Sequence, residues 1–127
     1  MTSAENSLNW FEISVADLDR AKKFYETIFG IKMEVQRMMS MDMASFPYDP
    51  MQFKVAGALV KSEYHTPSMD GVKVYLNGNP DLQSVLDKVE AAGGNIIMPK
   101  TQISPEVGYM AFIMDTEQNN IGLHSNN

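Results

Sequence analysis

An acidic side chain stands between apolar neighbours in segment 10–15, WFEISV, and is the first candidate for chemistry in this chain. The alternation of residue types predicts a β-strand, because successive side chains of a strand point to opposite faces. One face carries Trp10, Glu12 and Ser14, and the other is left to pack on the core. A carboxylate beside an indole could act as a general acid, act as a general base or contact a ligand directly.

A second polar face is predicted in segment 72–77, VKVYLN, which alternates in the same way. The apolar side chains, which are expected to pack on a helix, are those of Val72, Val74 and Leu76. The polar side chains, which are expected to face a ligand, are those of Lys73, Tyr75 and Asn77.

The two histidines complete the titratable candidates. His124 lies in a predicted strand, 120–125, and is with Glu12 a candidate acid or base. His65 lies in the polar segment 62–71, SEYHTPSMDG, which is predicted to be a linker, so it is expected to be exposed and outside the site. Structural interpretations stand beside the functional ones: Glu12 pairing with Lys73, Tyr75 as a core aromatic, and His124 on the surface. The sequence shows no signature of a Ser–His–Asp triad and no glycine-rich phosphate loop.

The composition excludes several classes of protein. With 16 acidic and 10 basic residues, the net charge is −6, which disfavours binding to nucleic acid or to an anionic membrane. There is no cysteine, and hence no disulfide or thiolate ligand. No apolar run approaches the roughly 20 residues of a membrane span, and the first residues do not resemble a secretory signal. A cytoplasmic protein is expected.

Methionine is unusually frequent: six of the 11 methionines fall between residues 33 and 51. This flexible, polarizable side chain suits an adaptable apolar pocket, and it also fills gaps in ordinary cores. Both interpretations stay open from the sequence.

The chain contains a weak internal repeat with a constant offset of 64 residues. Asp17-Leu18 matches Asp81-Leu82, Gly30 matches Gly94, and GALVKS at 57–62 matches IGLHSN at 121–126. In the first half, segment 17–29 has helical spacing of its apolar residues, with strands predicted at 31–38, 41–47 and 53–61. In the second half, a helix is predicted over 79–94, capped by Asn79, with strands near 95–99, 108–114 and 120–125.

Segment 9–30, NWFEISVADLDRAKKFYETIFG, resembles the opening of the vicinal oxygen chelate superfamily, which includes glyoxalase I, bleomycin-resistance proteins and extradiol dioxygenases. Segments 91–100 and 109–125 resemble its second module. The resemblance implies an α+β fold in which two βαβββ modules form an eight-stranded open cup with the helices outside. It divides one domain, 1–127, into module one (about 7–62), a linker (62–71) and module two (about 72–125).

Metal-using members of this superfamily hold an ion with one residue from the first and one from the last strand of each module. Those positions fall here on Trp10, Ala58, Lys73 and Gly122, none of which suits a divalent cation. We therefore predict no metal and no cofactor, with a divalent ion held by off-pattern residues as the alternative.

The resulting prediction is a glyoxalase-like homodimer that binds a small organic molecule. The expected ligand contacts are Trp10, Glu12, Lys73, Tyr75, Asn77 and His124. The alternative is a lyase, isomerase or dioxygenase-type enzyme of the same superfamily, with Glu12 or His124 as catalytic candidates. A degenerate domain that mediates association is a third class.

Overall fold

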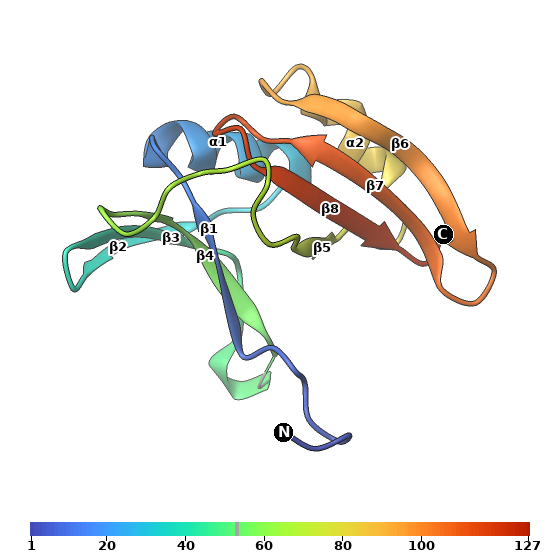
Figure 1. The fold of residues 1–127 in the computed structure, drawn as a ribbon, viewed down its shortest axis with the longest axis horizontal. Coiled ribbons are helices and arrows are strands. Elements are labelled where there is room, and N and C mark those ends of the chain that lie inside the picture. The colour runs from blue at the N-terminus through green and yellow to red at the C-terminus, as the bar shows by residue number, and fades with distance from the viewer. Residues whose placement is uncertain (53) are drawn as a thin grey trace.

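The computed structural model describes residues 1–52 and 54–127, and the chain follows the order strand, helix and three strands twice (Figure 1). The first module consists of β1 (Trp10–Ser14), α1 (Leu18–Phe29), β2 (Glu34–Met38), β3 (Met41–Ser45), a 3₁₀ turn η1 (Pro50–Gln52) and β4 (Ala56–Lys61). The second consists of β5 (Tyr75–Asn77), α2 (Gln83–Val89), β6 (Asn95–Ser104), β7 (Gly108–Met114) and β8 (Asn120–Ser125).

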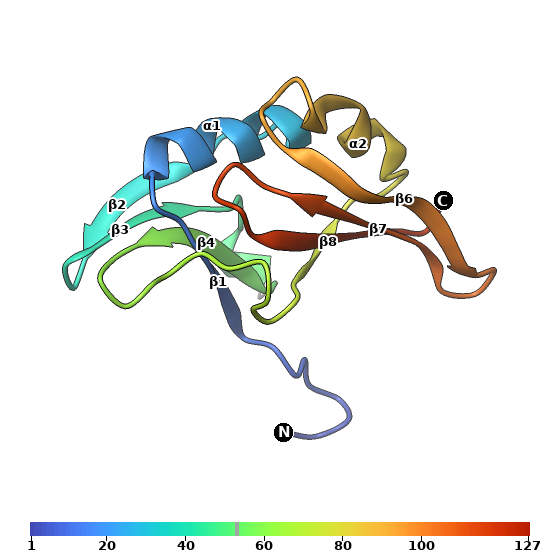
Figure 2. The ribbon, with the colours of Figure 1, turned by 45° about the horizontal axis from the view of Figure 1, so that its top comes forward.

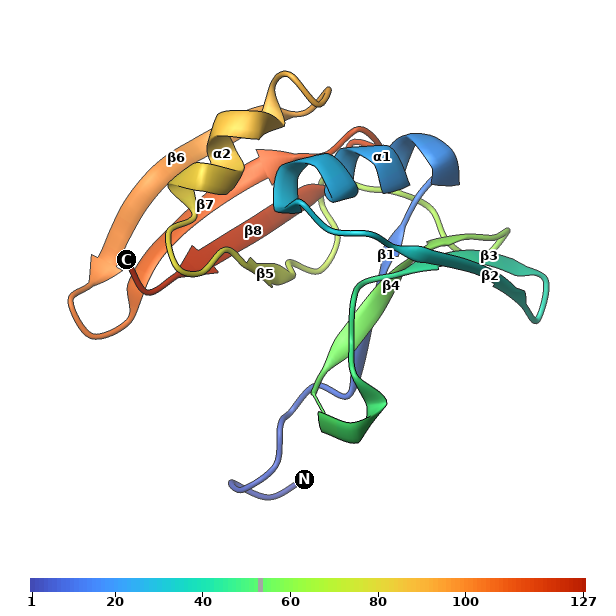
Figure 3. The ribbon, with the colours of Figure 1, turned by 180° about the vertical axis from the view of Figure 1, so that it is seen from behind.

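Each module forms its own four-stranded sheet, in the orders β1-β4-β3-β2 and β5-β8-β7-β6. Both helices lie on the same side of the two sheets, as Figure 2 shows, and β1 and β5 are the inner edges. Figure 3 shows the same arrangement from behind, with the two sheets splayed apart below the helices. This open arrangement of eight strands and two helices confirms the α+β fold class expected from the sequence.

Helix α1 begins and ends where the sequence predicts. The side chain of Asp17 accepts a hydrogen bond from Arg20 N, which caps the first turn, and Gly30 ends the helix in the left-handed conformation (φ 63°). The predicted apolar stripe packs into the core, with Ala21, Phe24 and Tyr25 among its fully buried members.

Helix α2 is shorter than the predicted 79–94, and Asn79 does not cap it. The Asn79 side chain instead accepts a hydrogen bond from Asn126 N, and the N–H of Leu82 donates to Ser125 Oγ. The C-terminal tail therefore occupies the polar groups that the prediction assigned to the helix start. The predicted stripe of Leu82, Val85, Leu86 and Val89 is nevertheless buried.

Several predicted strand ends differ from the structure. The strand predicted over 72–77 is formed only from Tyr75 to Asn77, and Val72, expected to pack on a helix, is 94% exposed. β2 begins at Glu34 rather than at residue 31, β3 ends at Ser45 rather than at 47, and β6 extends to Ser104 rather than to 99. β4 begins at Ala56 rather than at 53; residue 53 itself lies outside the described residues.

A buried polar cluster joins the turn between β7 and β8 to module one. Glu117, whose side chain is fully buried, accepts hydrogen bonds from Ala16 N and Asp17 N and from the Arg20 guanidinium, with the closest Arg20 contact at 2.7 Å. Tyr25 donates to Asp115 at 2.7 Å. This cluster fixes one end of the junction between the modules, because each of its donors and acceptors is paired.

The charge of Glu117 is stabilised despite its burial. Burial alone raises the pKa of this carboxyl, but the Arg20 hydrogen bonds and the N–H groups of Asp17 and Ala16, together with the Thr116 hydroxyl, lower it to about 2. In the same cluster, burial first and then the adjacent Asp115 carboxylate raise the pKa of the Tyr25 phenol well above its usual value.

Candidate functional site

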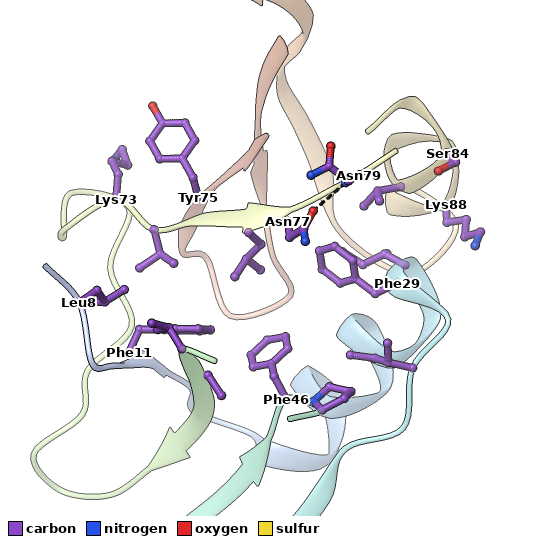
Figure 4. A pocket seen from close by; sticks show the side chains of 18 of the residues that line it. Leu8, Phe11, Phe29, Phe46, Lys73, Tyr75, Asn77, Asn79, Ser84 and Lys88 are labelled. Carbon is purple, nitrogen blue, oxygen red and sulfur yellow. Dashed lines mark hydrogen bonds between the residues drawn. The ribbon is translucent and has the colours of Figure 1, made fainter. Parts of the chain in front are cut away.

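A cavity of about 750 Å³ lies between the modules, below the helices (Figure 4). Its walls come from both modules: the end of α1, the β3–β4 loop and β1 on one side, and β5 and α2 on the other. Phe11, Phe29 and Phe46 line it with aliphatic side chains of both modules. A mostly apolar cavity with a few polar groups at its rim is the usual form of a small-molecule site.

Three of the six predicted ligand contacts, Lys73, Tyr75 and Asn77, line this cavity. The side chains of Lys73 and Tyr75, however, point away from the phenylalanines in Figure 4, so these two residues contribute the edge of the wall. Lys73 Nζ donates to the carbonyl of Met69 at 3.1 Å. Asn77 Oδ1 accepts a hydrogen bond from Asn79 N at 2.9 Å.

Trp10 and Glu12, two further predicted contacts, line a neighbouring cavity of about 330 Å³ between β1, the linker and the start of β8. The two cavities share part of their walls, including Leu8, Phe11 and Val74. The predicted residues of the first strand and of β5 therefore meet around one gap between the modules, but on different sides of it.

Glu12 is bonded to His65, which the sequence led us to place outside the site. His65 Nε2 lies 2.7 Å from Glu12 Oε1, and His65 Nδ1 lies 2.6 Å from Ser62 Oγ. Trp10 Nε1 donates to the other oxygen of Glu12 at 3.2 Å. The His65 side chain is only 16% exposed, so the expectation of an exposed linker histidine is wrong.

This chain of hydrogen bonds, which we call the linker clasp (Trp10, Glu12, Ser62 and His65), ties the linker to the face of β1. It takes the place of the Glu12–Lys73 pair that the sequence left open, because Lys73 is engaged with the linker backbone. A carboxylate next to an imidazole is also a pair that can move a proton. A Ser-x-x-His spacing at 62–65 was the only signal in the sequence that could have indicated it.

His124, the last predicted contact, lies on neither of these two cavities. Its Nε2 atom is 2.7 Å from the carbonyl oxygen of Val107, in the turn between β6 and β7. The imidazole therefore connects β8 to the β6–β7 turn, and within the described residues it makes no hydrogen bond to Glu12.

The four positions inherited from metal-using relatives do not fit a metal. Ala58 is fully buried against Met43 and Val60, and Trp10 donates its N–H to Glu12. At Gly122, an added Cβ atom would lie 2.7 Å from the ring of Tyr75, so this ring covers the place from which a ligand side chain would extend. Within residues 1–52 and 54–127, no group of three or more His, Asp or Glu side chains is placed to hold an ion.

The methionines divide between core and surface. Met33 and Met43 are buried, whereas Met39 and Met51 are 85% and 79% exposed. None of the six between residues 33 and 51 is among the described residues that line the 750 Å³ cavity. The apolar surface of this cavity is instead supplied by phenylalanine, valine, leucine and isoleucine.

The chain belongs to the Glyoxalase/Bleomycin resistance protein/Dioxygenase superfamily, whose family model matches residues 7–123. It is 30% identical over 115 residues to a glyoxylase-like domain-containing protein of Didymella fabae, and this match covers 88% of each chain.

Solved structures show the same fold at lower identity. A glyoxalase/bleomycin resistance protein from Albidiferax ferrireducens T118 superposes with a TM-score of 0.70 at 17% identity, covering 96% of this chain and all of the other. TnmS3, an antibiotic binding protein from Streptomyces sp. CB03234, superposes with a TM-score of 0.64 at 18% identity, covering 99% of this chain and all of the other. Glyoxalase I from Zea mays gives 0.67 at 19% identity, over 93% of this chain and 44% of that one.

No helix within the described part of the chain is long and apolar enough to cross a membrane.

Proposed function

We propose that this protein binds a small organic molecule in the 750 Å³ cavity between its modules, without a metal ion. The observation that carries the proposal is the cavity itself, which is lined by three phenylalanines and by aliphatic side chains of both modules. Planar or aromatic ligands suit such walls, because aromatic rings pack favourably on one another's faces and edges. The similarity to TnmS3, an antibiotic binding protein, supports a binding role.

The proposal extends to the assembly and the location of the protein. We propose a homodimer, because β1 and β5 are edge strands that pair with a neighbour on one side only among the described residues. Exposed Leu8, Val55 and Val72 lie beside these edges and offer apolar surface to a second copy. The expected compartment is the cytoplasm, and neither nucleic acid nor membrane is an expected partner of an acidic chain.

A calorimetric screen of aromatic compounds against the purified protein tests the binding role. Val55→Phe narrows the cavity mouth and should weaken binding about tenfold, since a clash in a packed site costs about 1–3 kcal/mol. Val107→Phe, at an exposed valine that does not line the cavity, is the matched control. Equal affinities of both variants and the wild type would place binding elsewhere.

An acid–base enzyme is the second candidate, favoured by the 2.7 Å contact between Glu12 and His65 beside the smaller cavity. Measuring the metal content of the purified protein distinguishes a metal-free binding protein from an enzyme that holds a metal ion. We expect less than stoichiometric metal and negligible glyoxalase I activity. Stoichiometric metal whose removal abolishes a measured turnover would favour an enzyme of the superfamily that uses off-pattern ligands.

A further inference from the structure

The charged residues around the 750 Å³ cavity are all of one sign. None of its described lining residues is Asp or Glu, although the chain contains 16 of them and has a net charge of −6. The lining includes two lysines, Lys73 and Lys88. The long-range field of an acidic protein favours cations, and a mouth with two lysines and no acid counteracts that field locally.

Two of the uncharged polar side chains at this mouth, the amides of Asn77 and Asn79, present donors. The side-chain oxygen of Asn77 is occupied by Asn79 N, and the side-chain oxygen of Asn79 is occupied by Asn126 N, at 2.9 and 2.7 Å. Because backbone N–H groups donate in both contacts, the carbonyl end of each amide is identified, and the NH₂ end is left for another partner. Neither NH₂ group donates to another residue in the described part of the chain.

The polar groups are gathered at one end. Figure 4 shows Asn77, Asn79 and Lys88 at the α2 end of the cavity, with Leu8 and Phe11 at the opposite end. Lys88 makes no ion pair within residues 1–52 and 54–127. A molecule that fills this space thus meets the amide of Asn77 at one end, with Asn79 and Lys88 at the rim beyond it, and apolar walls along its length.

We infer that the ligand is an amphipathic anion, with a carboxylate at the α2 end and an aromatic or aliphatic body between the phenylalanines. This inference rests on the proposed binding function and names the chemical class of its ligand. A carboxylate accepts hydrogen bonds only, and such charge-assisted bonds are about twice as strong as neutral ones. A cationic ligand of the same shape would place its donors against the donors of the protein.

Three probes of nearly equal shape test the inference by isothermal titration calorimetry in low salt at pH 7.5: 2-naphthoate, 2-naphthamide and 2-naphthylmethylammonium. We expect 2-naphthoate to bind about fivefold or more tighter than the amide, with the ammonium weakest, as for a partly exposed charged contact. Equal binding of all three, or tighter binding of the ammonium, would overturn the anionic ligand and leave the binding function intact. Absence of saturable binding by any probe would overturn both.

Two variants assign the preference to the named groups. Asn77→Asp keeps the acceptor for Asn79 N but replaces the NH₂ donor by a carboxylate oxygen, so it should remove the preference for 2-naphthoate over 2-naphthamide. Lys88→Gln should weaken the binding of 2-naphthoate a few-fold and leave the affinity for 2-naphthamide unchanged. The matched controls are Asn95→Asp and Lys23→Gln, at exposed positions that do not line the cavity. An unchanged preference in both test variants would overturn the assignment.

Discussion

The β7–β8 turn and the β3–β4 loop occupy equivalent places in the two modules, 64 residues apart, since β8 begins at Asn120 and β4 at Ala56. The first carries Asp115, Glu117 and Asn119, which are buried against module one. The second reaches the 750 Å³ cavity with Phe46, Pro47 and Val55, and its described residues make no hydrogen bond or ion pair with α2. One end of the module junction is closed by paired charges, and the other is open and apolar.

The sequence differences between the modules explain this asymmetry. Arg20 and the N–H of Ala16, which bind Glu117 at the closed end, correspond at an offset of 64 to Ser84 and to Pro80, which has no N–H. The open end therefore lacks the counterparts of the backbone N–H and the guanidinium that hold the Glu117 side chain at the closed end. The two modules therefore differ at equivalent places of their junction: one is closed by the buried polar cluster, and the other borders the 750 Å³ cavity.

Breaking the closed end should have the largest effect. Glu117→Ala removes a buried carboxylate that accepts hydrogen bonds from two backbone N–H groups and from Arg20, and it leaves these donors without a partner. We expect a loss of about 3–5 kcal/mol in the free energy of unfolding, measured by urea denaturation. Glu106→Ala, at an exposed acid, is the control, and equal stability of both variants would contradict a structural role for the cluster.

The stabilisation by Glu117 should depend on pH. Because its pKa is lowered from 4.5 to about 2 by folding, the contribution is complete above the unfolded pKa and is lost as pH falls through the folded pKa. We expect the difference in unfolding free energy between the wild type and Glu117→Gln to shrink between pH 4.5 and pH 2. A constant difference across this window would rule out the depressed pKa.

A smaller loss is expected from the phenol of the same cluster. Tyr25→Phe removes the donor to Asp115 Oδ2 and leaves that buried carboxylate with one hydrogen bond fewer. The unfolding free energy should fall by about 1–3 kcal/mol, the cost of an unsatisfied buried group. The matched variant Tyr64→Phe, at an 84% exposed tyrosine, should be neutral. A neutral Tyr25→Phe would mean that the hydrogen bond adds nothing to the junction.

The linker clasp should contribute least. Glu12→Gln replaces the charged partner of His65, and since both side chains are partly exposed, the loss should be about 1 kcal/mol or less. Faster amide hydrogen exchange in the linker, residues 62–71, is the more sensitive measurement. Glu63→Gln, in the same segment, is the control. If the linker exchanges equally in both variants, Glu12 does not hold it, and a direct ligand contact by Glu12 is favoured.

Local periodicity was sufficient to predict the two modules and most of their elements. The helical spacing from Leu18 to Ile28 and the alternation in segment 10–15 report which face of each element is buried, and burial depends mainly on residue type. The same period placed Trp10 and Glu12 on the face away from the helices, as the structure has them. The start of α2 was mispredicted, because a distant tail residue, Asn126, takes the side chain of Asn79.

The candidate site depended on contacts that no local pattern encodes. Glu12 and His65 are 53 residues apart in the sequence, and their hydrogen bond exists because the linker folds back across β1. The 750 Å³ cavity lies at the end of the module junction that has no buried ion pair. The other end is held together by the paired charges of Glu117 and Arg20. The sequence by itself determined the repeated fold and the polar faces of its strands; the tertiary structure decided which of those residues share a cavity, because only packing between modules brings them together.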